Sequence, residues 1–235
     1  MAKEYFVLYT PDDMNKAYEL FSKEFSRAEI FDTLQGYDDI KKQICLLKMN
    51  DLKSSEEAEI LVSVLTGQHG PVREICSAKI NEFVKNEDYR NFFDNEEISE
   101  ILLNALNDII PTVARNISEV INLFPQKKYL KEKLFERILE VENCQEEEMP
   151  SGNHEITRTN FKLYWYLDAL YFLTESGDNS ETLEEIIQKA HNHADYTIRE
   201  KVARILSGLD GFKNYKDILL NDENPYVVRN LQNML

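Results

Sequence analysis

The chain has 235 residues, of which 43% are hydrophobic and 11% aromatic, so it holds enough apolar material to build a core. Its 43 acidic residues outnumber its 27 basic ones, and the formal net charge of -16 argues against nucleic acid and membrane lipid as partners. With only seven glycines and six prolines, the composition favours helices joined by short turns and disfavours an all-β fold.

The N-terminal segment "MAKEYFVLYTPDD" has only a short apolar run before a Pro-Asp-Asp turn signal, too little for a signal peptide. No stretch approaches the roughly 18 uninterrupted apolar residues of a membrane span. The three cysteines, Cys45, Cys76 and Cys144, are widely spaced and lack a CxxC or Cys/His cluster, which is typical of reduced thiols. We therefore expect a cytoplasmic protein.

Residues 1–50 contain two helical patterns: 12–25 begins one, and 37–49 resembles the later motif "YTIREKVARIL" with Lys41 in the place of the arginine. The terminal unit of a helical array must present one face to water instead of to a neighbour, so its sequence usually diverges. We expect residues 1–50 to form divergent N-terminal helices that cap such an array.

Beyond residue 50, two kinds of helical segment alternate. The first kind often opens with Ser, Asp or Asn followed by glutamates, as helix N-termini commonly do. Its copies are 54–67, 94–108, 127–143, 179–193 and 212–222. The second kind has an arginine near its start, and its copies are 67–83, 110–124, 153–167, 194–206 and 224–235. Each unit is therefore predicted to be helix, turn, helix.

The arginines of the second segments recur at spacings of 42, 43, 41 and 30 residues. They are Arg73, Arg115, Arg158, Arg199 and Arg229. An arginine at a helix start is poorly placed for the helix dipole, but its guanidinium can bind a carboxylate in a neighbouring turn bidentately. The recurrence predicts an array of about forty-residue units with a short last unit, held by an arginine ladder.

Three of the motifs, "GPVREICSAKI", "YTIREKVARIL" and "NPYVVRNLQNML", resemble HEAT repeats of the armadillo-like class. The resemblance implies an all-α fold, an α-α superhelix or solenoid of about five to six HEAT-like helix pairs. It covers roughly residues 37–235, and we expect a single domain, 1–235, with repeats over 51–235. It also implies that aspartates in the turns meet the arginines, Asp195 with Arg199 and Asp222 with Arg229.

The aromatic segment "NFKLYWYLDALYFLTE", residues 160–175, carries the only tryptophan and is apolar on most of its circumference. Tyr164, Tyr166 and Tyr171 exceed what a core needs. With Asp168 they are candidate partner-binding residues, and core packing is the alternative.

The acidic stretch 140–155, which includes Glu146, Glu147 and Glu148, is predicted to be the longest turn between paired helices. It either captures a basic peptide or serves as a flexible linker.

Catalytic and metal-binding motifs are missing from the sequence. The four histidines, His69, His154, His191 and His193, fall at or near turns between paired helices. Adjacent turns of a stack lie about 10 Å apart, too far to share one ion, so no metal site is predicted. No phosphate-binding Gly-rich loop, GxSxG elbow or HExxH motif occurs, and we expect no catalytic residue and no cofactor.

The function predicted from these features is a non-catalytic scaffold that binds a protein or peptide partner on its concave helical face. The acidic surface favours basic partners. The alternative is an enzyme of the HEAT-like class, such as a bilin lyase that acts on a bound chromophore. DNA glycosylases of that class need a basic groove, which the charge of this chain argues against.

Overall fold

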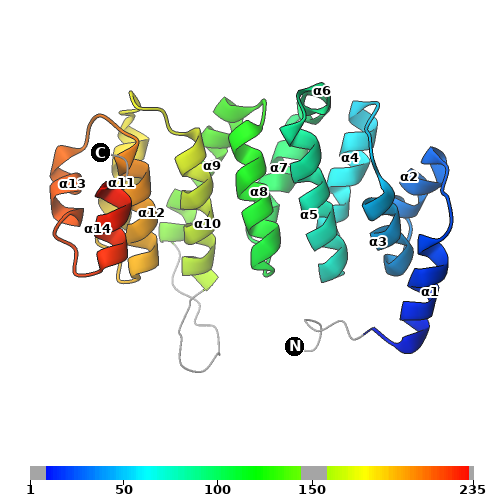
Figure 1. Cartoon of the computed structure of the whole chain (residues 1–235). Helices are drawn as coiled ribbons and strands as arrows, with labels where there is room; N and C mark the ends of the chain where they lie inside the picture. The colour runs from blue at the N-terminus through cyan, green and yellow to red at the C-terminus, as the bar shows by residue number, and fades with distance from the viewer. Residues whose placement is uncertain (1–8, 144–157, 233–235) are drawn as a thin grey trace. The chain divides into compact units, whose positions relative to one another are not determined.

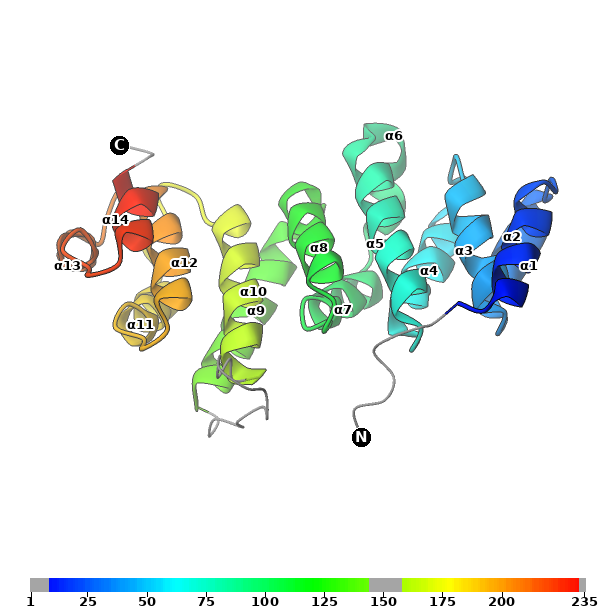
Figure 2. The ribbon, with the colours of Figure 1, turned by 60° about the horizontal axis from the view of Figure 1, so that its bottom comes forward.

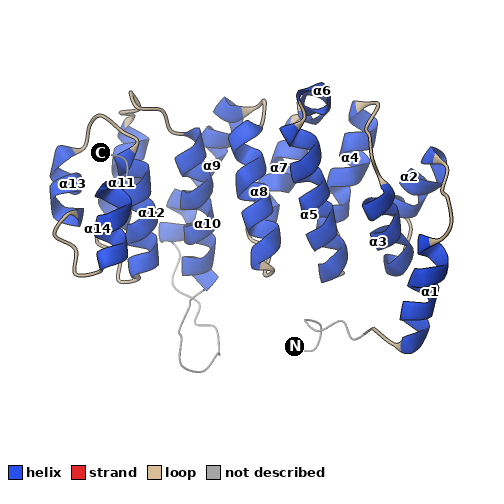
Figure 3. Cartoon of the chain, in the orientation of Figure 1, coloured by secondary structure: helices blue, strands red, loops and turns tan. Residues whose placement is uncertain are grey.

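The computed structural model describes residues 9–143 and 158–232. In these ranges every regular element is a helix (Figures 1 and 3), which confirms the predicted all-α helical-repeat fold. The α-helices are α1 (Pro11–Phe21), α2 (Arg27–Gln35), α3 (Asp39–Lys48), α4 (Ser55–Ser63), α5 (Gly70–Lys85), α6 (Glu87–Arg90), α7 (Glu96–Ala105), α8 (Pro111–Leu123), α9 (Lys127–Asn143), α10 (Arg158–Leu173), α11 (Glu181–Ala190), α12 (Tyr196–Ser207), α13 (Lys213–Leu219) and α14 (Pro225–Gln232). Two short 3-10 helices cover Val64–Thr66 and Asn91–Phe93.

Side chains cap many of these helices where the sequence predicted a helix start. The Ser54 hydroxyl accepts a hydrogen bond from the Glu57 amide at the start of α4, and the Ser180 hydroxyl accepts one from Leu183 at the start of α11. Asn95 caps α7 in the same way. Each cap satisfies a backbone N–H that the first helical turn leaves without a partner.

The helices form two compact units, Met1–Gln126 and Lys127–Leu235, and each is described here by itself. In the first unit α3, α5 and α8 lie side by side in one layer, and α2, α4 and α7 form the layer behind them (Figures 1 and 2). Helix α1 packs on α3 at the end of the layer. Phe83, Phe93 and Phe124 are among the largest fully enclosed side chains of this core.

The second unit repeats the two-layer arrangement. Helices α10, α12 and α14 lie side by side, and α9, α11 and α13 pack behind them (Figure 2). The pairs α2–α3, α4–α5, α7–α8, α9–α10, α11–α12 and α13–α14 make six helix pairs in the described residues, within the predicted number. Whether the two units make one domain, as the sequence predicts, stays a prediction.

Burial gives the register of the repeats. Helix α5 buries residues 72, 76, 80 and 83, and the buried residues of the next second helix, 113, 117, 121 and 124, each follow their counterparts by 41 positions. Within each set the buried residues are 4, 4 and 3 positions apart, and the buried residues 198, 202, 206 and 209 in and just after α12 have these same intervals. The position after the first buried residue of each set is Arg73, Ala114 and Arg199. This position, rather than the arginine itself, marks equivalent points of the repeat.

No helix in the described ranges has the length and apolar character needed to cross a membrane. Cys45 and Cys76 are free thiols within the core, and Cys144 lies outside the described residues. The Cys76 thiol donates a hydrogen bond to the Leu61 carbonyl at 3.1 Å. Burial raises the pKa of both described thiols, so each stays protonated and packs as a small apolar side chain.

Candidate functional site

In the first unit, Arg73 on α5 joins two successive helix pairs. Its Nε donates to Asp108 Oδ2 at 2.5 Å and its Nη2 to Asp108 Oδ1 at 3.1 Å, a bidentate pair. Its Nη1 donates to the carbonyls of Gly67 and Gln68 at 2.9 and 2.7 Å. Asp108 Oδ1 also accepts the Ile110 amide at 2.9 Å, which orders the turn before α8. The side chains of the ion pair are only 10% and 6% exposed.

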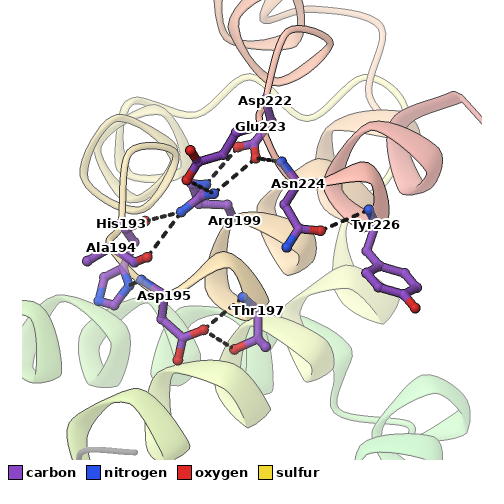
Figure 4. Close-up of polar contacts among 9 residues, drawn as sticks. All are labelled: His193, Ala194, Asp195, Thr197, Arg199, Asp222, Glu223, Asn224 and Tyr226. Atoms are coloured by element: carbon purple, nitrogen blue, oxygen red, sulfur yellow. Dashed lines mark hydrogen bonds and ion pairs between the residues drawn. The ribbon is translucent and has the colours of Figure 1, made fainter. Parts of the chain in front are cut away.

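In the second unit, Arg199 on α12 makes the same set of bonds (Figure 4). Its Nε and Nη2 donate to Asp222 at 2.7 and 3.0 Å, and its Nη1 donates to the carbonyls of His193 and Ala194 at 2.8 and 3.2 Å. Asp222 Oδ1 accepts the Asn224 amide at 2.8 Å. The hydrogen bonds from Arg199 hold the pKa of Asp222 below its usual range, and those bonds raise the pKa of Arg199.

These two ion pairs correct the predicted ladder. Asp222 binds Arg199, from the preceding pair, and not Arg229, which is exposed on α14. Asp195 does not pair with Arg199: one of its oxygens caps the Thr197 amide at 2.9 Å and the other accepts Asn160 Nδ2 at 3.3 Å.

The other three predicted arginines do not stand at the position that Arg73 and Arg199 occupy in their helices. Arg115 and Arg229 each stand one residue after the ladder position, and both side chains are exposed to solvent. Arg158 stands two residues before Asn160, whose amide occupies the arginine's place opposite Asp195. Where the ladder forms, its donors bind a carboxylate and two carbonyls, so it joins repeats and offers little to a ligand.

Helix α10 divides its predicted binding residues between core and surface. Tyr166 and Trp165 are 4% and 7% exposed and belong to the core, which corrects the assignment of Tyr166 to a binding surface. Tyr164, Asp168 and Tyr171 are spaced i, i+4, i+7 and share one side of the helix. The two tyrosines are partly exposed, whereas Asp168 is buried. Glu146, Glu147 and Glu148 lie outside the described residues.

A charged cluster joins that side of α10 to α12. Asp168 Oδ1 accepts hydrogen bonds from Lys201 Nζ at 2.7 Å and from Arg204 Nη1 at 2.9 Å. Lys201 Nζ lies 4.2 Å from the Tyr164 ring centroid, and Arg204 Cζ lies 4.1 Å from that of Tyr171. Both distances are within the range of cation–π attraction. The cluster therefore holds both tyrosine rings in place.

Two further tyrosines lie on α12 and α14. Tyr196 and Tyr226 are 40% and 58% exposed, and their rings stack with centroids 6.5 Å apart. Figure 4 shows the Tyr226 side chain pointing away from the ladder. One helical turn on, Glu200 Oε1 accepts a hydrogen bond from Asn230 Nδ2 at 2.9 Å.

Contacts join these side chains across α10, α12 and α14: Arg204 lies against Tyr171, Tyr196 stacks on Tyr226, and Tyr196, Glu200 and Arg204 follow one another at i, i+4, i+8 along α12. We call this surface the tyrosine face. Its members are Tyr164, Asp168, Tyr171, Tyr196, Glu200, Lys201, Arg204, Tyr226 and Asn230.

Sequence reasoning missed the α12 and α14 members of the tyrosine face. A signal was present in the two repeat motifs "YTIRE" and "YVVRN", each of which has a tyrosine just before the first buried residue of its helix: Tyr196 stands two residues before Ile198, and Tyr226 stands one residue before Val227.

The equivalent surface of the first unit has no tyrosine at the matching positions. Asn116 Nδ2 donates to the Ser77 hydroxyl at 3.0 Å, and Asn81 Nδ2 donates to Glu119 at 2.9 Å. By the burial register, Ser77 corresponds to Tyr164, Asn81 to Asp168 and Glu119 to Arg204. The same two contacts are thus made with neutral and acidic groups in the first unit, and with aromatic and cationic groups in the second.

The histidines serve local structure. His69 Nδ1 accepts the Val72 amide at 3.4 Å as the cap of α5, and His193 Nδ1 accepts the Asp195 amide at 3.0 Å. His191 lies against the Tyr215 ring, with centroids 4.9 Å apart, and His154 lies outside the described residues. Over 9–143 and 158–232, no three His, Cys, Asp or Glu side chains are grouped so as to hold a metal ion.

No protein-family model matches the sequence, and a comparison with curated proteins found no significant match. Solved structures do resemble it. A designed armadillo repeat protein in complex with peptide (KR)4 has a TM-score of 0.50 at 13% identity, over 87% of this chain and 96% of that one. An engineered structural-genomics protein gives a TM-score of 0.47 at 15% identity, over 95% and 97% of the two chains.

The complex of CpcE and CpcF of phycocyanin lyase from Nostoc sp. gives a TM-score of 0.48 at 14% identity, over 88% of this chain and 75% of that one. Identities this low speak for the fold and not for a shared activity. The two-layered helix pairs and the likeness to the designed armadillo protein show that this chain has a helical-repeat fold.

Proposed function

We propose that the chain is a non-catalytic scaffold that binds a protein or peptide partner on the tyrosine face. One observation carries the proposal: four tyrosines from three neighbouring helices, two of them partly exposed and two exposed at 40% and 58%, share one surface. Tyrosine offers a large contact area with few rotatable bonds, so it loses little entropy on binding and is enriched in interfaces. Of the predicted partner-binding residues, Tyr164, Asp168 and Tyr171 are members of the tyrosine face, whereas Glu146, Glu147 and Glu148 lie outside the described residues and stay a prediction.

Asp168 positions other residues of the tyrosine face. Its carboxylate is 10% exposed and accepts hydrogen bonds from two cations, so it holds Lys201 and Arg204 against the tyrosine rings rather than contacting a partner. Rings fixed before binding cost less entropy to immobilise.

The net charge of -16 favours a predominantly basic partner, because opposite charge accelerates encounter and suppresses acidic competitors. The fold is compatible with this, since the designed armadillo protein similar in fold was solved with a peptide of lysine and arginine. Among the described residues, no specific observation favours the alternative of lyase-like chemistry.

Selection from a random peptide library on the immobilised protein tests the proposal. A consensus peptide would be synthesised and its affinity measured by calorimetry for the wild type, for Tyr226→Ala and for Tyr18→Ala. Tyr226 and Tyr18 are both exposed, at 58% and 71%, but only Tyr226 belongs to the tyrosine face.

We expect Tyr226→Ala to weaken binding about tenfold, the effect of losing roughly 1.4 kcal/mol of contact. Tyr18→Ala should leave the affinity unchanged. Failure to enrich any peptide, or equal affinity of both variants and the wild type, would defeat the proposal.

A further inference from the structure

We infer that Arg204 is a carboxylate-binding subsite within the tyrosine face, and that it takes a carboxylate of the partner. The inference rests on the proposed function for its biological meaning, but the site can be tested without a peptide. The partner is then expected to be a predominantly basic segment with one acidic group at a fixed place.

The charges of the cluster leave one cation in excess. One carboxylate, Asp168, receives two cations at the same oxygen, Lys201 at 2.7 Å and Arg204 at 2.9 Å. The side chains of Asp168 and Lys201 are each 10% exposed, and this inner pair is already neutral. The Arg204 side chain is 32% exposed and adds a positive charge on the solvent side. The three side chains thus carry one net positive charge, which an incoming anion can neutralise.

Neighbouring groups leave Arg204 available. Glu200, one turn earlier on α12, accepts a hydrogen bond from Asn230 and is engaged toward α14. A guanidinium has five N–H donors, and Arg204 donates through Nη1 to Asp168. Its other donors can take the two oxygens of a carboxylate side by side.

The Arg204 guanidinium is held in place before any anion binds. Arg204 Cζ lies 4.1 Å from the Tyr171 centroid and 5.2 Å from the Phe172 centroid, so aromatic rings support the guanidinium. The bond to Asp168 fixes its rotation from the other side. A side chain held in this way loses less conformational freedom when it binds an anion than a free surface arginine does.

The surroundings of Arg204 also make the subsite selective. The equivalent position in the first unit is Glu119, a carboxylate that would repel an anion. The overall charge of -16 also repels a wholly acidic partner. A single cationic subsite on such a surface therefore fixes the register of a basic partner through its one acidic group, rather than supplying most of the affinity.

The test follows the arginine side-chain Nε–Hε signals of the labelled full-length protein by NMR while sodium acetate is added, with sodium chloride at equal ionic strength as the blank. Arg204→Gln assigns the Arg204 signal. Arg115 and Arg229 are exposed and serve as matched internal controls. We expect the Arg204 signal to shift and saturate in the millimolar range, with much smaller, linear shifts of the controls. A shift of Arg204 no larger than theirs overturns the inference.

Two further probes identify the source of the carboxylate. N-acetylglutamate α-amide carries only a side-chain carboxylate, and N-acetylalanine carries only a terminal one; the tighter binder indicates which the partner supplies. Arg204→Lys keeps the charge but loses the planar fork, so acetate should shift the signals of the neighbouring Tyr171 ring in the wild type and shift them much less in this variant. Retention of the full acetate effect in this variant would also overturn the inference. Acetate binding without any selectable peptide would refute the proposed function and leave the subsite standing.

Discussion

Removal of the Asp222 carboxylate should destabilise the second unit by about 3 kcal/mol. The Arg199 and Asp222 side chains are 11% and 7% exposed, so Asp222→Ala leaves an enclosed guanidinium whose remaining acidic contact is the 3.8 Å one between its Nη2 and Glu223, a side chain that is 92% exposed. Breaking a buried ion pair from one side costs roughly 3–5 kcal/mol. Arg199 keeps its bonds to the carbonyls of His193 and Ala194, which places the expected loss at the lower end.

The assay is urea unfolding followed by circular dichroism, with Arg229→Ala as the matched control. Arg229 is the arginine that sequence spacing assigned to Asp222, yet it is exposed, and its removal should change the free energy of unfolding by no more than about 0.5 kcal/mol. The double variant Arg199→Met/Asp222→Ala should recover part of the loss, since it removes the stranded charge. If Arg229→Ala costs as much as Asp222→Ala, the register derived from burial is wrong.

Three further outcomes are expected. The fold lowers the pKa of Asp222, so the ionised carboxylate stabilises the protein fully above the ordinary aspartate pKa of about 3.9. This stabilisation is lost as the pH falls through the lower pKa of the folded state. The difference in free energy of unfolding between the wild type and Asp222→Asn should therefore close when unfolding is measured at increasingly acid pH. Asp168→Ala should cost more stability than Arg204→Gln in thermal melts, because it leaves two cations facing each other. Cys45 and Cys76 should resist a thiol reagent until the protein is unfolded, and modification of either in the native state would contradict their burial.

The helix pairs could be predicted because their signals are local. Capping residues such as Ser54 and Ser180 satisfy the helix that follows them, and they start α4 and α11 as the sequence indicates. The pairing of arginines with aspartates was predicted wrongly, because the spacing of the arginines does not follow the spacing of the buried residues. Arg115 and Arg229 lie one residue beyond the position that the buried stripe defines, so their spacing is coincidental.

The tyrosine face could be predicted only in part, because its contacts join residues far apart in sequence. The spacing of Tyr164, Asp168 and Tyr171 on one helix was visible in the sequence. The pairing of Asp168 with Lys201 and Arg204, 33 and 36 residues away, depends on how α10 and α12 pack. Helix propensity and hydrophobic periodicity do not predict contacts between residues so far apart in sequence. Packing of α10 against α12 brings these three side chains together.

Hydrogen–deuterium exchange of the protein with and without a selected peptide tests the central claim most directly. The account predicts slower exchange on binding in α10, α12 and α14, the layer that carries the tyrosine face, with little change in α9, α11 and α13. Protection confined to α9, α11 and α13, or to the first unit, would contradict it.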